Sequence, residues 1–204
     1  MPIYDPTTAL LVVDVQNDFA DPSGSLYVRG GEDIVPLINA EISRAKAAGS
    51  PVVYTQDWHP ASTPHFEKDG GIWPVHCVQN TWGAELHPEL SVDGPIVQKG
   101  SNGEDGYSGF THRDPVSGET APTALAGLLG ESGVTRLVIA GLATDYCVKS
   151  TVLDGRERGY PVTVIQNGIR AVELQPGDGD SAIEEMLAAG ALLESRATVG
   201  LSGG

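Results

Sequence analysis

Short apolar runs alternate with stretches of helical periodicity along this 204-residue chain, and this alternation limits its possible folds more than any other feature. Such runs are typical of strands that helices cover on both faces. We therefore expect an α/β fold, a three-layer α/β/α sandwich around a mainly parallel sheet. Strands are predicted at residues 9–13, 51–56, 94–98, 134–140 and 161–165, with a last short strand at 191–194.

Helices are predicted at residues 32–48, 123–132, 178–189 and from the turn at Cys147 to about Arg158. Their apolar positions indicate which side chains enter the core. Those positions are Val35, Ile38, Ile42, Ala45, Leu125, Leu128, Leu129, Ile183, Met186 and Leu187. Residues 17–31, 58–88 and 100–118 have the composition of loops, and long irregular segments of this kind often carry function.

The composition is that of a globular protein, with 40% hydrophobic and 19% charged residues. We expect one domain over residues 1–204, with a flexible tail at about 200–204. The net charge of -15 argues against nucleic acid and anionic membranes as partners, because both require a basic surface. We see no signal peptide or membrane span, and two cysteines do not make a disulfide framework, so we expect a cytoplasmic protein. The sequence is compatible with a homo-oligomer.

Four reactive residues follow the predicted strands: Asp14, Asp57, Lys99 and Cys147. In a parallel sheet the carboxyl ends of the strands share one edge, where ligands bind. One polar residue at a strand end is expected by chance, whereas four at the same edge indicate a site.

Cys147 is predicted to lie at a strand-to-helix turn, with Asp145 as the helix N-cap. The positive end of a helix stabilises a thiolate, which would make Cys147 a nucleophile. Asp14 could serve as its base, and Lys99 could stabilise both negative charges. The alternatives are a buried packing cysteine, a turn aspartate and a solvated surface lysine.

Asp57, His59, His65 and His76 form a second group. An aspartate and a histidine two residues apart on a strand point the same way, and one carboxylate with two or three imidazoles suits a divalent metal. Zn²⁺ is the first choice, with Fe²⁺ and Mn²⁺ as alternatives. The alternative is a set of scattered loop histidines, as we expect for His87 (structural) and His112 (loop).

Three aromatic residues, Phe19, Trp73 and Tyr107, lie in loops at the same edge. They could form the walls of a pocket for a flat ring, or each could anchor its own loop. Cys77 has no base or helix start near it in sequence and is predicted to be a packing residue.

The motifs together resemble the nicotinamidases of the isochorismatase-like cysteine hydrolase superfamily, over nearly the whole chain. Val-Asp-x-Gln at 13–16 and Ala-Thr-Asp-x-Cys-Val at 143–148 are marks of the superfamily. Asp-Trp-His-Pro at 57–60 and Trp-Pro-x-His-Cys at 73–77 are narrower marks of nicotinamidases. Further marks are residues 24–26, 99–100 and 107–110.

This resemblance implies hydrolysis of nicotinamide to nicotinate and ammonia through a cysteine thioester, in NAD salvage, with pyrazinamide as a further substrate. It implies a catalytic triad of Asp14, Lys99 and Cys147. The N–H groups of Ala143 and Cys147 would form an oxyanion hole beside a cis peptide that precedes Ala143. The resemblance also implies a metal site and a ring pocket. The metal ligands would be Asp57, His59 and His76, with His65 in some members only, and the ring would contact Phe19, Trp73 and Tyr107.

Two alternative functions follow from the same residues. Another amide or carbamoyl hydrolase of the superfamily would share the cysteine turn, but such relatives generally lack the Asp-x-His…His cluster. A non-catalytic metal-binding homologue would not need Asp14, Lys99 and Cys147 together. The extended loop at 111–118 departs from the family pattern and bears on the shape of the pocket.

Overall fold

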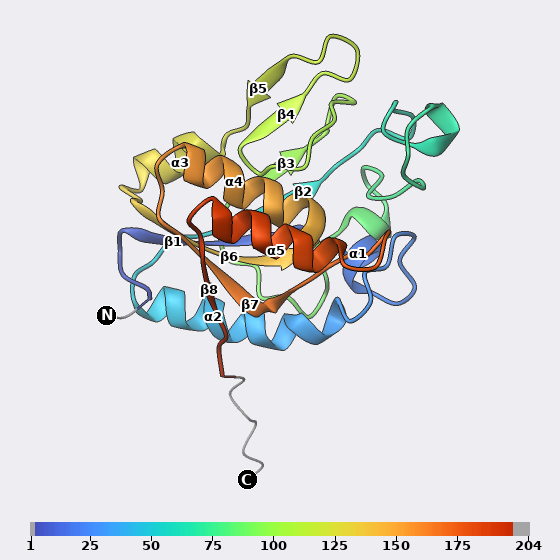
Figure 1. Cartoon of the computed structure of the whole chain (residues 1–204). Helices are drawn as coiled ribbons and strands as arrows, with labels where there is room; N and C mark the ends of the chain where they lie inside the picture. Colours follow the sequence, from blue (N-terminus) through green and yellow to red (C-terminus); the bar gives the residue numbers. More distant parts are fainter. Residues whose placement is uncertain (1–2, 198–204) are drawn as a thin grey trace.

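The computed structural model describes residues 3–197, and it contains a six-stranded parallel sheet between two layers of helices (Figure 1). The strand order is β3-β2-β1-β6-β7-β8. The strands are β1 (Thr8–Val13), β2 (Val52–Asp57), β3 (Ile96–Lys99), β6 (Arg136–Leu142), β7 (Val162–Arg170) and β8 (Leu192–Glu194). The helices are α1 (Asn17–Ala20), α2 (Val35–Ala47), α3 (Leu125–Glu131), α4 (Lys149–Glu157) and α5 (Asp178–Ala188). The expected tail at 200–204 lies outside the described residues.

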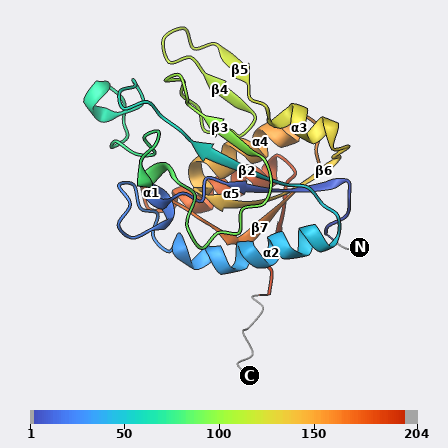
Figure 2. The same ribbon diagram turned by 180° about the vertical axis from the view of Figure 1, so that it is seen from behind.

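The core is divided by the sheet, because alternate residues of each strand point to opposite faces. In β1, Leu10 and Val12 pack with α2 on one face, whereas Leu11 and Val13 pack with α3, α4 and α5 on the other. The view from behind shows α2 along the lower side of the sheet, with the short helix α1 near one end of it (Figure 2). The predicted α/β/α sandwich is therefore confirmed.

Several local features of the structure differ from the predictions made from the sequence. Residues 111–118, expected as loop, and the residues that follow them up to 122 form an antiparallel hairpin of β4 (Thr111–Arg113) and β5 (Thr120–Pro122) that projects beside β3 (Figure 1). His112 is accordingly in a strand. Leu187, expected in the core, is 46% exposed. The segment after β1 contains the short helix α1, which was not predicted because residues 17–31 have the composition of a loop.

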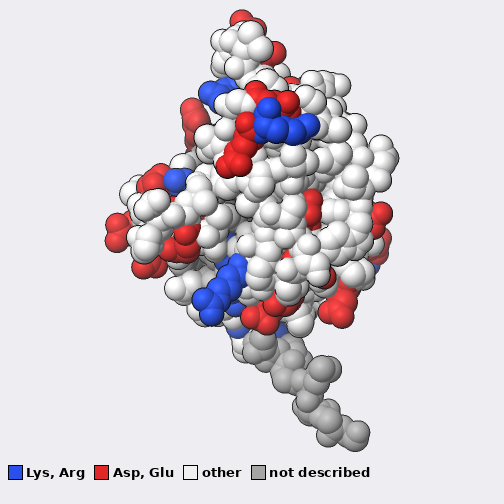
Figure 3. Space-filling model, turned by 90° about the vertical axis from the view of Figure 1, so that its right-hand side faces the viewer, with Lys and Arg blue, Asp and Glu red and all other residues white. Residues whose placement is uncertain are grey.

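No helix among residues 3–197 is long and apolar enough to cross a membrane. The face in Figure 3 is mostly uncharged and carries several scattered groups of acidic side chains, with fewer basic side chains among them.

Candidate active site

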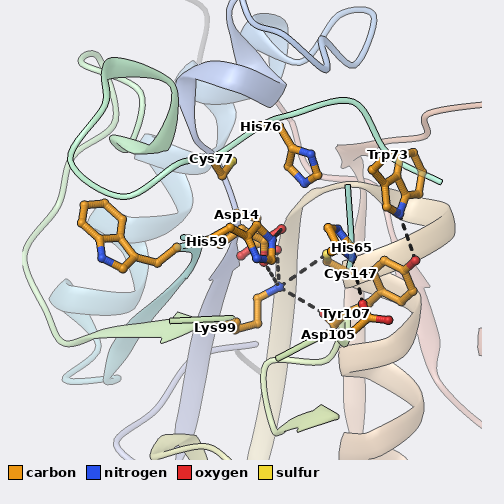
Figure 4. A network of polar contacts seen from close by, with 12 residues as sticks. Asp14, His59, His65, Trp73, His76, Cys77, Lys99, Asp105, Tyr107 and Cys147 are labelled. Atoms are coloured by element: carbon orange, nitrogen blue, oxygen red, sulfur yellow. Dashed lines mark hydrogen bonds and ion pairs between the residues drawn. The ribbon is translucent and has the colours of Figure 1, made fainter. Parts of the chain in front are cut away.

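The four residues predicted at the strand ends meet at one buried point of the carboxyl edge, and Figure 4 labels three of them, Asp14, Lys99 and Cys147. Lys99 Nζ lies 2.8 Å from Asp14 Oδ2, 2.7 Å from Asp57 Oδ1 and 3.5 Å from Cys147 Sγ. Lys99 is 1% exposed and Asp14 is completely buried. The structure therefore brings together the three residues of the predicted triad, with Asp57 as a fourth member of the cluster.

The sheet register explains this convergence. Asp57 and Lys99 are direct partners on the adjacent strands β2 and β3. Val13 at the end of β1 pairs with Gly141 in β6, so the segments that carry Asp14 and Cys147 leave the sheet next to each other. After β1 the chain proceeds through β2 to β3 on one side, and β6 occupies the other side. The site thus lies at the switch point of the topology, where α/β sheets bind ligands.

The charges at this point depend strongly on one another. Burial alone would lower the pKa of Lys99, but the two carboxylates raise this pKa well above its usual value. Burial raises the pKa of Asp14, against the effect of the neighbouring ammonium. Burial also acts to raise the pKa of Asp57, yet Lys99 and His59 hold it at about 2. We therefore describe Lys99 as an ammonium shared by two carboxylates.

Cys147 lies at the predicted strand-to-helix turn, but the type of helix, the N-cap and the ionisation differ from the sequence prediction. It lies in a π-helical turn, Thr144–Val148, before α4. Asp145 is not an N-cap, because its carboxylate accepts hydrogen bonds from the N–H groups of Val172 and Glu173, both at 2.9 Å. Burial raises the pKa of the Cys147 thiol well above its usual value, despite the presence of Lys99. The resting side chain is therefore a thiol, and an oxygen of Asp14 lies within 4.8 Å of its sulfur to take the proton.

The turn before Cys147 has the backbone geometry that the resemblance implies. The peptide bond between Leu142 and Ala143 is cis. Among residues 3–197, no backbone group accepts a hydrogen bond from the Ala143 N–H. Gly141 is required here, because its φ is 129° and a Cβ would lie 2.1 Å from the carbonyl oxygen of Val13.

A cluster of three buried histidines lies next to the cysteine. One ring nitrogen from each of His59, His65 and His76 lies within 4.8 Å of the other two. Asp57 borders the cluster, with Oδ2 at 3.9 Å from His59 Nε2. His65, which the sequence left least certain, is therefore in the same cluster as the other two histidines.

The chemistry of these donors fits a divalent cation. Burial lowers the pKa of His59 to about 4 and also lowers that of His76, so both rings are neutral and can act as ligands. Neither ring nitrogen of His59 has a hydrogen-bond partner among the described residues, although the side chain is buried. Asp57 Oδ1 makes no aligned hydrogen bond either, although it lies close to Lys99. Unpaired buried ring nitrogens such as those of His59 are costly, and a bound cation would satisfy one of them.

A cavity opens above Cys147 and the histidines. The three predicted ring-binding residues line it, and Trp73 Nε1 donates a hydrogen bond to the Tyr107 hydroxyl at 3.0 Å. Ala143 and Cys147 are part of the same wall. The full lining is Phe19, Leu26, Asp57, His65, Trp73, His76, Tyr107, Ala143, Tyr146, Cys147 and Val172. The arrangement suits a small flat molecule whose reactive carbon can reach the sulfur.

Cys77 and His87 have local structural roles. Cys77 is buried, and its N–H donates to Asp18 Oδ2 at 2.7 Å. The ring of His87 accepts a hydrogen bond from the N–H of Glu89 in its own loop.

Sequence reasoning missed several residues that support the site. Thr55 donates a hydrogen bond to Asp14 Oδ1 at 2.5 Å, and its place two residues before Asp57 on the same strand is a signal that could have found it. Gln16, quoted only as a family mark, pairs with both the N–H and the C=O of Asp57. Tyr146 lines the cavity, and its ring meets that of Trp73 edge to face.

Comparisons with known proteins agree with this geometry. The nicotinamidase of Escherichia coli is 41% identical to this chain, over 92% of the chain and 94% of the relative. A zinc complex of the pyrazinamidase of Pyrococcus horikoshii superposes with a TM-score of 0.83 at 38% identity, covering 94% of this chain and all of the other. PnC1 of L. infantum, solved with nicotinate, gives a TM-score of 0.84 at 35% identity, covering 95% and 96% of the two chains. The isochorismatase domain matches residues 8–198, and the chain therefore belongs to the isochorismatase family.

Proposed function

We propose that this protein is a nicotinamidase, which hydrolyses nicotinamide to nicotinate and ammonia and also accepts pyrazinamide. The observation that carries the proposal is the contact of Asp14 and Lys99 with Cys147 in the wall of an aromatic cavity, next to a cluster of three histidines. The nicotinamidase and pyrazinamidase relatives support the choice of substrate.

In the first half of the proposed reaction, Cys147 Sγ attacks the carboxamide carbon while its proton passes to Asp14. The carbonyl electrons move to oxygen, which the N–H groups of Ala143 and Cys147 stabilise as an oxyanion. Collapse of this intermediate breaks the C–N bond, and Asp14 returns the proton to the leaving nitrogen. Ammonia departs and a thioester remains.

In the second half, Asp14 takes a proton from water as the water oxygen attacks the thioester. Collapse breaks the C–S bond and the proton on Asp14 returns to the Cys147 sulfur. Nicotinic acid is released and loses its own proton to water to give nicotinate. Lys99 holds Asp14 in place and stabilises the negative charge that passes between the carboxylate and the sulfur. The thiol pKa, raised by burial, makes the base necessary, because little thiolate forms without it.

Four side chains would hold one divalent cation: Asp57, His59, His76 and His65. We propose Zn²⁺ as the cation. Fe²⁺ and Mn²⁺ are the alternatives, because imidazole and carboxylate ligands bind all three ions. When bound, such a cation supplies Lewis acidity that polarises and orients the substrate ring. Phe19, Trp73 and Tyr107 would enclose that ring. We also propose a single domain and a role in NAD salvage in the cytoplasm.

The test is ammonia release from nicotinamide by the purified protein, before and after chelation and again after a divalent metal is restored. We expect release that chelation abolishes and metal restores. Cys147→Ala should abolish turnover and keep its bound metal, because the cysteine is outside the proposed ligand set. A metal-loaded wild-type protein that releases no ammonia would reject the proposal, as would full activity in the alanine variant.

A further inference from the structure

Asp105, in the loop after β3, makes a set of contacts that the proposed reaction does not use. Its Oδ1 lies 2.9 Å from His65 Nδ1 and accepts the N–H of Gly106 at 2.7 Å. Its Oδ2 accepts a hydrogen bond from Arg113 Nη2 at 2.8 Å. Each oxygen of this half-buried carboxylate is therefore assigned, one toward a histidine of the cluster and one toward the β4–β5 hairpin.

The hairpin fixes Asp105 through the backbone as well as the side chain. The N–H of Asp105 donates to the C=O of Arg113 at 2.7 Å, and the N–H of Arg113 donates back. A residue held by two backbone hydrogen bonds and one side-chain contact to the same partner has little freedom to turn. The hairpin thus connects a projecting, exposed part of the chain to the buried histidines.

The contact determines which nitrogen of His65 can bind a metal. An ionised carboxylate only accepts hydrogen bonds, so His65 must carry a proton on Nδ1. The lone pair is then on Nε2. His76 is oriented in the same way, since its Nδ1 lies 2.7 Å from the C=O of Pro74. A carboxylate partner does more than a carbonyl, because it also makes the ring a stronger ligand.

We propose that Asp105, held by Arg113, is a positioning residue that orients His65 as a metal ligand and strengthens the binding of the cation. This inference rests on the metal site of the proposed function. It gives the β4–β5 hairpin a role in the metal centre, in addition to any effect on the shape of the pocket.

The experiment measures the affinity of the metal-free protein for Zn²⁺ by competition with a chromophoric chelator. Asp105→Ala should weaken binding by about 10- to 100-fold, the usual cost of losing such a partner. Asp105→Asn keeps an oxygen for His65 without the charge and should lose less. Glu104→Ala is the matched control, because the neighbouring Glu104 carboxylate contacts Asn102. This variant should bind Zn²⁺ with wild-type affinity. The visible spectrum of the Co²⁺-loaded protein should change in the Asp105 variants and stay the same in the control.

A double-mutant cycle separates positioning from a general effect on the fold. If Asp105 acts through His65, then Asp105→Ala should cost less than about twofold in affinity when His65 is already alanine. An equal loss in both backgrounds would overturn the inference, and so would wild-type affinity in Asp105→Ala. Failure of the wild-type protein to bind Zn²⁺ would overturn it together with the proposed metal site. If the metal-loaded wild-type protein does not hydrolyse nicotinamide, only the proposed substrate is rejected. The Zn²⁺ affinities are measured without nicotinamide and do not depend on that result.

Discussion

Lys99→Met removes the cation that two buried carboxylates share, while it keeps a side chain of similar length. Asp14 and Asp57 lie 2.8 and 2.7 Å from the ammonium, and neither has appreciable access to water. Removing one partner of such a buried pair costs about 3–5 kcal/mol in the free energy of unfolding. Against a total stability of about 5–15 kcal/mol, this loss should be obvious in urea denaturation of the metal-free protein.

The pH dependence of this loss makes the prediction specific. Without Lys99, the two carboxylates repel each other, and the pKa of Asp14, already raised by burial, rises further. A group whose pKa is raised in the folded state stabilises the fold at low pH and loses that contribution as the pH rises through the folded pKa. The difference in stability between wild type and variant should therefore be greatest at about pH 8 and smaller at about pH 5.5. A proton taken up by a neighbouring histidine would act in the same direction.

Matched urea titrations of both proteins at the two pH values would check this reasoning. A destabilisation that does not change with pH would show that the ammonium is not what holds the carboxylates ionised. A variant as stable as wild type at about pH 8 would refute the shared-cation description altogether. Activity should be lost in either case, so activity alone does not decide the matter.

Three further changes test other parts of the site. Asp57→Ala should reduce the bound metal well below one equivalent in elemental analysis, and retained stoichiometric metal would rule out Asp57 as a ligand. Gly100→Ala should weaken Zn²⁺ binding in the chelator assay, because φ of Gly100 is 76° and the new Cβ would lie 2.5 Å from His59 Nδ1. Unchanged Zn²⁺ affinity would show that the loop adapts without moving the His59 ring. Thr55→Val should lower the free energy of unfolding by about 1–3 kcal/mol, because it removes a buried hydrogen bond to Asp14. This hydrogen bond lowers the pKa of Asp14, so the acid limb of the kcat/KM profile should move to higher pH. An acid limb that does not move would contradict this role of Thr55.

The predicted elements agree best with the structure where the sequence pattern indicates buried residues without ambiguity. The apolar run that precedes Asp14 is a completely buried strand, and all four predicted core positions of α2 are buried. The errors occur where local pattern competes with packing. Leu187 follows the helical period of α5 but faces outward. The β4–β5 hairpin was missed because its short strands are mostly exposed and have little apolar alternation.

The sequence by itself determined the order of the elements and the edge of the sheet where the reactive residues lie. This was possible because buried parallel strands have a recognisable composition, and their carboxyl ends share one edge. Only the tertiary structure decided how the side chains meet: Lys99 between Asp14 and Asp57, His65 within the histidine cluster, and Asp105 on Nδ1 of His65. It also decided that Cys147 is a buried thiol, whereas its place in the sequence suggested a thiolate. These properties depend on distances between segments far apart in the chain and on their burial, and local sequence patterns contain neither.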